Sequence, residues 1–198
     1  VYKRQTVNYT DPSTGLKSET EYKVHFKEGG ALEQPLSTLV SIPTMAGETP
    51  LIRPENNRLL YAYSGYAGIY QNQNQNGGAL TTGPADLQTV YSTGFAGNTE
   101  QIMDIDISGC NAVSFQGVGG IDWLMKGGNS KSTIKFEVWA HKDVSMLTKE
   151  YYENEENIDP TKNSRGTADW TATGWVKLAE SGQIVGNAEN PKYAFANV

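Results

Sequence analysis

Short segments in which apolar and polar residues alternate are the feature that most constrains the fold of this chain. Successive side chains of an extended chain point to opposite faces, so such alternation indicates a strand with one buried and one solvated face. Tyr22, Val24 and Phe26 share one face of such a segment, over residues 22–27. The same kind of pattern recurs in 102–107, 113–115, 133–139, 175–178 and 184–185. These segments predict a chain made mainly of short strands.

Turn-forming residues lie between several of the predicted strands. Segment 126–130 is rich in glycine and asparagine, so we expect 121–125 and 133–139 to pair across it as a hairpin. Segment 117–120 has three glycines but lacks the lysine and the following helix of a phosphate-binding loop. We interpret it as a turn at the end of a strand.

The composition of four segments disfavours strand formation. Residues 146–156 favour one short helix at most, because their apolar residues do not sustain a helical period. Residues 158–173 are polar and are predicted to form a long loop, and the Asn/Gln-rich residues 71–78 are predicted to form a mobile loop tip. Residues 31–58 contain four prolines, which lack the backbone donor that a central strand needs, so we expect an extended arm crossing the surface.

Length and composition favour one main all-β domain. A chain of 198 residues can bury one good core, and 21 glycines with only 19% charged residues describe a globular protein rich in turns. Many short strands with weak helix signals favour an antiparallel β-sandwich of jelly-roll type, with long loops and at most one or two short helices. We assign residues 6–58 to an N-terminal strand and Pro-rich arm, and residues 59–198 to the sandwich domain.

Residues 1–5 are set apart from this prediction. Val1-Tyr2-Lys3-Arg4-Gln5 is similar to the translated end of a transposase-based sequencing adaptor, which predicts a sequence assembled from a metagenomic library. The true amino terminus and any secretion signal would then be missing. At the other end, residues 193–198 resemble an interrupted strand, so we expect the gene to continue past residue 198. A domain cut at chosen boundaries is the alternative. We expect an extracellular, cell-surface or virion location.

Charge and cysteine content exclude several classes of partner. A net charge of -6 disfavours nucleic acid and anionic membrane surfaces as partners. No apolar run approaches the ~20 residues of a membrane-spanning helix. The single cysteine, Cys110, cannot form an internal disulfide, and no Cys/His spacing resembles a zinc site. We therefore expect neither a metal nor a cofactor.

The order of several segments resembles that of a known family. Residues 87–94, 99–113, 131–140 and 174–178 are similar in pattern to the galactose-binding-like, discoidin-type jelly roll, over about residues 85–198. The resemblance implies a jelly-roll fold and carries over no ligand-binding residue. The chain departs from the family at Ile107-Ser108, where the family has Leu-Gly, and at a long insertion over 141–173. The composition also resembles that of virion accessory proteins of tailed phages.

Carboxylates are the first candidates for chemistry. Asp104 and Asp106 lie two residues apart on one predicted strand, as a shared cation or an acid–base pair would require. The simpler interpretation places both on the solvent face of the strand. Glu137 could act as a glycosidase carboxylate, but cross-strand pairing of Lys135 and Glu137 with their neighbours is the ordinary explanation.

Histidine and cysteine side chains are the second candidates. His25 and His141 are far apart in sequence, and no Gly-x-Ser-x-Gly nucleophile motif is present. We interpret both as surface histidines and Cys110 as a packed, inert thiol.

Aromatic residues are the best candidates for ligand binding. Trp170 lies in the predicted loop with Asn163, Arg165 and Asp169, and this combination offers a sugar an apolar platform and partners for its hydroxyl groups. The alternative is that Trp170 folds back and closes the end of the sandwich. Four tyrosines could form a second binding patch, an inter-subunit surface or simply the packed side chains of a strand: Tyr61, Tyr63, Tyr66 and Tyr70.

These features together predict a non-catalytic β-sandwich binding module, carbohydrate-binding or adhesive in function. The alternative is a structural protein of a phage virion or tail, or of another surface assembly, motivated by the Pro-rich arm. A glycoside hydrolase-like enzyme using Asp104, Asp106 or Glu137 is the third hypothesis. The expected partners are a glycan or other protein subunits, including further copies of the chain.

Overall fold

The computed structural model describes residues 2–10, 17–25, 33–43, 49–82, 89–98, 100–122, 133–154, 157, 174–186 and 192–198, the first two ranges as backbone only. The chain divides into two compact units. The first contains a hairpin of two strands. The second contains the other described strands and helices, over Gln34–Cys110 and Ser114–Val198.

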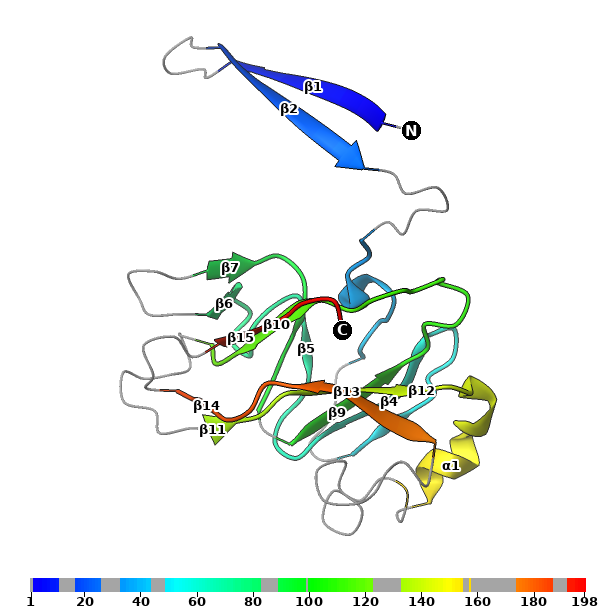
Figure 1. Ribbon diagram of the computed structural model, residues 1–198. Helices are drawn as coiled ribbons and strands as arrows, with labels where there is room; N and C mark the ends of the chain where they lie inside the picture. The colour runs from blue at the N-terminus through cyan, green and yellow to red at the C-terminus, as the bar shows by residue number, and fades with distance from the viewer. Residues whose placement is uncertain are drawn as a thin grey trace. The chain divides into compact units, whose positions relative to one another are not determined.

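The first unit is an antiparallel hairpin of two nine-residue strands (Figure 1). Strand β1 (Tyr2–Thr10) pairs with β2 (Lys17–His25), with Tyr2 opposite His25. The strand predicted at 22–27 is confirmed as far as His25, and its last two residues lie outside the described ranges. Residues 2–5, which the adaptor interpretation set apart, form the first part of β1.

The second unit is mostly β, with antiparallel strand pairs and one short α-helix. Strands β3, β4 and β9 form a three-stranded sheet, and the other strands pair as β5–β8, β6–β7, β10–β15, β11–β14 and β12–β13 (Figure 1). The strand bounds are β3 (Leu51–Ile52), β4 (Leu59–Ser64), β5 (Tyr70–Gln71), β6 (Leu80–Thr82), β7 (Thr89–Tyr91), β8 (Phe95–Ala96), β9 (Gln101–Ile105), β10 (Gly117–Gly120), β11 (Thr133–Ile134), β12 (Glu137–His141), β13 (Trp175–Glu180), β14 (Ile184–Val185) and β15 (Lys192–Phe195).

The sheet β3–β4–β9, which we call the central sheet, is covered on both faces. Tyr61 and Leu60 of β4 belong to a first hydrophobic cluster, against which Trp175 and Trp139 pack from β13 and β12. Leu59 and Ala62 of β4 belong to a second cluster on the other side of the strand. A register shift in β4 between Leu59 and Tyr61 lets neighbouring residues enter different clusters. Most of β4 is therefore buried on both faces.

The single α-helix, α1 (Lys149–Glu153), packs beside the first cluster through the buried Tyr152. The Thr148 side chain caps it by accepting a hydrogen bond from the backbone N–H of Tyr151 at 3.2 Å. A 3-10 helix, η3 (Val144–Met146), precedes it. The prediction of one short helix in 146–156 is confirmed, and none of the helices in the described part of the chain has the length and apolar character needed to cross a membrane.

The glycine-rich segment differs from its prediction. Gly117–Gly120 forms strand β10, which pairs antiparallel with β15, whereas we expected a turn there. Gly119 sits where a Cβ atom would come within 2.6 Å of the Phe136 ring, so close packing against this ring requires the glycine. The strand expected at 113–115 is not formed, and Val113 is strongly exposed.

The hairpin expected between 121–125 and 133–139 also requires correction. Residues 121 and 122 are not in a strand, and 123–125 lie outside the described residues. The segment 133–139 divides into β11 and β12, which pair with β14 and β13, far along the chain. The strands predicted at 175–178 and 184–185 are confirmed as β13 and β14.

Two segments predicted to be an arm and a mobile tip are packed into the second unit. Residues 34–43 and 49–58 of the Pro-rich segment belong to this unit, include the 3-10 helix η1 (Leu36–Thr38), and bury Val40 in the second cluster. In the Asn/Gln-rich segment, Asn74 is only 1% exposed and its side chain accepts hydrogen bonds from the N–H groups of Asn76 and Gly78. The Gln71 side chain donates to the Ser37 and Val40 carbonyls, so the two segments hold each other in place.

Candidate functional site

The predicted ligand residues Asn163, Arg165, Asp169 and Trp170 lie outside the described residues. The structure does describe the residues at the two ends of their segment. Asn157 precedes it, just after α1, and Gly174 follows it, just before β13. The candidate site is therefore built from the surroundings of these two residues.

Five rings form what we call the aromatic cluster: Tyr61, His141, Tyr151, Tyr152 and Trp175. Tyr61 of β4 stacks on Tyr152 of α1, with ring centroids 5.0 Å apart and an interplanar angle of 4°. Tyr151 meets Tyr152 edge to face at 5.1 Å, and His141 meets Trp175 in the same manner at 5.2 Å. The Trp175 indole N–H donates to the Tyr151 hydroxyl at 3.1 Å, which joins the two groups of rings.

The two described residues that flank segment 158–173 lie at this cluster. The Asn157 side-chain amide donates to the Tyr151 carbonyl at 3.0 Å. Gly174 has a φ of +92°, a value that favours glycine, and a Cβ atom there would lie 2.5 Å from Nε2 of His141. Asn157 thus contacts the backbone of Tyr151, and Gly174 lies against the His141 ring, so each of the two residues adjoins a member of the aromatic cluster.

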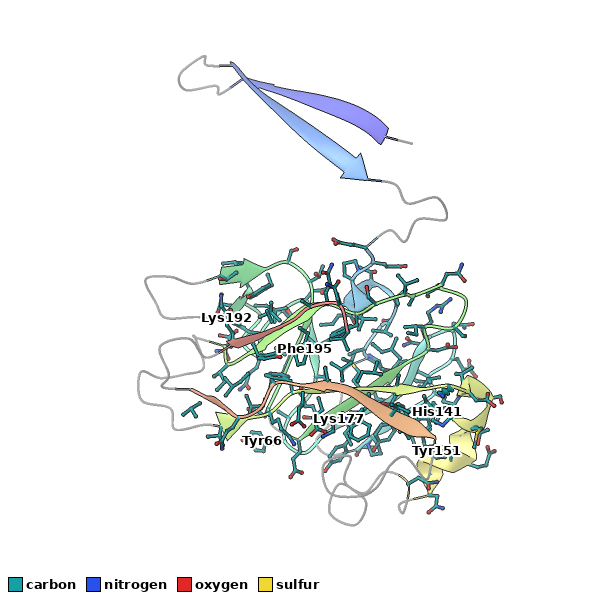
Figure 2. All side chains as sticks on the ribbon, viewed as in Figure 1. Tyr66, His141, Tyr151, Lys177, Lys192 and Phe195 are labelled. Carbon is teal, nitrogen blue, oxygen red and sulfur yellow. The ribbon has the colours of Figure 1, made fainter. Side chains whose placement is uncertain are left out.

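The five rings of the aromatic cluster differ in solvent exposure. Tyr61, Tyr152 and Trp175 are buried, whereas His141 and Tyr151 are half-buried. The two half-buried rings lie at the end of β12–β13 beside α1 (Figure 2). Nδ1 of His141 accepts the backbone N–H of Asp143 at 3.1 Å, so in the neutral ring the proton lies on Nε2. The cluster thus offers partly exposed rings on a rigid base.

Asp104 contradicts the prediction of a solvent-facing carboxylate. It is 5% exposed, and one of its oxygens accepts a hydrogen bond from the Tyr152 hydroxyl at 2.9 Å. The physical reason is that α1 and β12–β13 cover the face of the central sheet on which Asp104 lies. The alternating pattern of β9 therefore does not separate a buried from a solvated face.

Asp106 has different surroundings. Its carboxylate accepts the Ser108 backbone N–H at 2.8 Å. Partial burial raises the pKa of the Asp106 carboxyl, but hydrogen bonds from Ser108 and the positive charges of Arg58 and Arg53 outweigh this effect and lower the pKa. This arrangement stabilises a turn after β9.

Glu137 has the cross-strand surroundings that we predicted. It forms ion pairs with Lys135 and with Lys177 of β13, and it accepts the Trp139 indole N–H at 2.9 Å. Lys177 also pairs with Glu180 at 2.8 Å and lies 5.4 Å from the centre of the Trp139 ring. Partial burial raises the pKa of Glu137, yet the hydrogen bonds from Lys135, Trp139 and Lys177 outweigh it and lower the pKa. A glycosidase acid needs the opposite shift.

The remaining candidates are Cys110 and the two histidines. Cys110 is a half-buried free thiol whose sulfur lies 3.4 Å from Nη1 of Arg58. Arg58 also donates to the Asp106 and Ser108 carbonyls, so it holds the loop that contains the thiol. His25 belongs to β2, and His141 is half-buried against Trp175, not a free surface residue.

The four tyrosines do not form one exposed patch. Tyr61 is 2% exposed and Tyr63 packs against the same first hydrophobic cluster, which confirms the interpretation of this segment as a packed strand. Tyr66 is 70% exposed, in the loop after β4, and Tyr70 is half-buried in β5.

Sequence reasoning missed Tyr151 and His141 as members of the candidate site. The signal that could have found them is their position, since His141 opens the 141–173 insertion and Tyr151 lies within it, ahead of the predicted loop 158–173. Their common contact with Trp175 could not be predicted, because it depends on the packing of α1 against β13.

In the part of the chain that the structure describes, no three His, Cys, Asp or Glu residues are grouped so that they could hold a metal ion. Comparison with known proteins adds no relative: no protein-family model, no curated protein and no solved structure matches this chain.

Proposed function

We propose that this protein is a non-catalytic binding module that recognises a carbohydrate, as an adhesin does, at the aromatic cluster. The observation that carries the proposal is that Asn157 and Gly174, the described residues that flank segment 158–173 with its Trp170, lie against Tyr151 and His141 of the cluster. We expect the ligand to contact Trp170 together with the half-buried rings of Tyr151 and His141. An extracellular, cell-surface or virion location suits such a role.

The fold we propose for the module is an antiparallel β-sandwich of jelly-roll type. Support comes from the first hydrophobic cluster, in which Trp139 and Trp175 of β12–β13 pack against Tyr61 of the central sheet. Two sheets whose inner faces interdigitate in this way are the basis of a sandwich. Loops at one end of such a scaffold are the usual place for recognition.

The chemistry of the cluster suits a sugar ring. A sugar presents an apolar face of C–H groups and a rim of hydroxyls, so it is bound by an aromatic ring together with planar hydrogen-bonding groups. The Tyr151 hydroxyl is fixed by the Trp175 indole, and the His141 ring is fixed by the Asp143 N–H. Rings that are already held in place lose little conformational entropy when a ligand binds.

A hydrolytic function is less well supported. Glycoside hydrolysis requires one carboxyl group to be protonated as a general acid, which needs a raised pKa. The pKa of Glu137 is lowered by its three donors, and Asp104 is engaged by the Tyr152 hydroxyl. Binding without chemistry agrees better with these surroundings.

A glycan array probed with the full chain tests the proposal. We expect at least one glycan class to bind, and both Trp170→Ala and Tyr151→Ala to weaken binding about tenfold or more, the loss expected for one stacking ring. Tyr66→Ala is the matched control, because Tyr66 is exposed outside the aromatic cluster. Circular dichroism should show that all variants remain folded. A blank array at high protein concentration would contradict the proposal.

A structural protein of a virion or other surface assembly is the second candidate. The specific observation in its favour is the β1–β2 hairpin, which forms a compact unit distinct from the rest of the chain. Assembly proteins commonly use such extensions to reach a neighbouring subunit. A chain that stays monomeric in light scattering at every concentration would count against this candidate.

A further inference from the structure

Strand β2 has a long edge that no described strand covers. Among the strands that the structure describes, β2 pairs only with β1, over nine residues. A two-stranded hairpin is marginally stable in water, and an open edge of this length presents a row of backbone donors and acceptors to another strand. The hairpin unit therefore suits a partner that adds a strand.

The charges along β2 indicate which partner fits. Glu19, Glu21, Lys23 and His25 occupy every second position of the strand and so lie on one face. Suppose a second β2 runs antiparallel to the first, with the two-fold axis at Tyr22. Glu21 then lies opposite Lys23 of the partner subunit, and Glu19 lies opposite His25 of the partner subunit. Each pair occurs twice because the interface is symmetric.

Neighbouring registers are less complementary. An axis at Glu21 pairs Glu19 with Lys23 of the partner subunit but places Glu21 opposite its own copy. An axis at Lys23 likewise places Lys23 opposite its own copy, and an axis at Thr20 places Glu19 opposite a second Glu21. Like charges directly opposite each other destabilise a strand pair, whereas opposite charges stabilise it. An axis between two residues brings a charged position opposite an uncharged one and mixes the two faces of the hairpin.

We infer that two copies of this chain associate through β2 of each, antiparallel about Tyr22, and join their hairpins into one four-stranded sheet. The occupant of the open edge is thus a second copy of the chain. This association is separate from glycan binding, which uses the other unit.

Charge reversal on the full chain tests the inference, with sedimentation velocity as the measurement. Glu21→Lys alone and Lys23→Glu alone each convert two attractive pairs into repulsive ones, so each should weaken the dimer about tenfold or more. An equimolar mixture of the two variants should form a heterodimer, because positions 21 and 23 of one chain then face the opposite charge on the other. Lys142→Glu is the matched control for Lys23→Glu, since it makes the same charge change at an exposed position in the other unit and should dimerise like the parent.

Disulfide trapping tests the register, in a Cys110→Ser background. Directly opposite residues of antiparallel strands have Cα atoms ~4.5–5.5 Å apart, which a disulfide can span. Tyr22→Cys should therefore cross-link two chains readily. Thr20→Cys is the control, because the two copies of position 20 would be offset by ~13 Å along the strands.

Each outcome either supports or overturns the inference. A parent chain that is monomeric at all concentrations, single variants that dimerise like the parent, or equal cross-linking at positions 20 and 22 would each overturn the inference. Heterodimer formation from two variants that do not dimerise alone would support it. None of these results depends on glycan binding, so the two proposals fail independently.

Discussion

At the scale of single residues, the contact between Asp104 and Tyr152 links α1 to the central sheet. The Tyr152 hydroxyl donates to the carboxylate at 2.9 Å, and both residues are buried. A hydrogen bond to a charged group contributes about 1.5–3 kcal/mol to stability, more than a bond between neutral groups. This bond therefore helps to hold Tyr151, the next residue of α1, in the candidate site.

Removing the donor should destabilise the fold. We expect Tyr152→Phe to lower the free energy of unfolding by about 1–3 kcal/mol, because a buried carboxylate loses a hydrogen bond. Denaturant unfolding followed by circular dichroism measures the change. Tyr66→Phe is the matched control and should change the free energy by less than about 0.5 kcal/mol, since Tyr66 is exposed. Equal effects of the two variants would show that the Asp104 contact does not stabilise the fold.

Glu137 should make stability depend on pH in the acid range. Its pKa is lower in the folded chain than its ordinary value of 4.5, so the unfolded chain binds the proton more readily. The stability it contributes is present above pH ~4.5 and is lost as the pH falls through the folded-state pKa. The difference in unfolding free energy between the parent and Glu137→Gln should thus shrink on acidification. Glu55→Gln, on an exposed turn, is the control, and a pH-independent difference would contradict the prediction.

The roles of single residues were predictable only where neighbours in sequence determine them. Cross-strand pairing of Glu137 was expected from the strand pattern and is confirmed by its ion pair with Lys177 of β13. Burial of Asp104 could not be predicted, because alternation reports a polar position without showing that a helix some 45 residues later covers it. The four predicted loop residues, Trp170 among them, lie outside the described part and stay predictions.

At the scale of elements, β10 is a strand that the alternation of apolar and polar residues does not predict. It consists of three glycines and one valine, and it pairs with β15, more than 70 residues away in sequence. Glycine carries no apolar signal, so the segment was interpreted as a turn. Strands β9, β13 and β14 were predictable because their apolar residues alternate or cluster between turns.

A methyl group at Gly119 should be costly. Its Cβ atom would lie 2.6 Å from Cδ2 and 2.7 Å from Cγ of the Phe136 ring. We expect Gly119→Ala to lower the free energy of unfolding by about 1–3 kcal/mol, as overpacking usually does. Val118→Ala, at the exposed neighbouring position, should change it little. Thermal unfolding of the two variants compares them, and a harmless Gly119→Ala would mean that β10 does not pack tightly on this ring.

At the scale of the whole molecule, the two-sided burial of the central sheet explains most departures from expectation. The Pro-rich segment was predicted to be an arm because proline rarely enters central strands, yet its apolar residues Val40 and Leu51 pack on the second hydrophobic cluster. The mostly-β, antiparallel character was predictable from alternation and turns. Which strands pair was not predictable, because the partners of β10, β11 and β12 are all distant in sequence.

In the proposed function, recognition takes place at the end of the sheet beside α1. There Asn157 and Gly174, which flank segment 158–173, adjoin the aromatic cluster, and His141 and Tyr151 are half-buried. The most direct measurement is a two-dimensional ¹H–¹⁵N NMR spectrum of the full chain, recorded with and without the glycan class that binds. We predict shifts in the Trp170 and Trp175 indole signals and in the amides of residues 151, 157 and 174. Shifts confined to the β10–β15 pair, or no shifts at saturating glycan, would contradict the account.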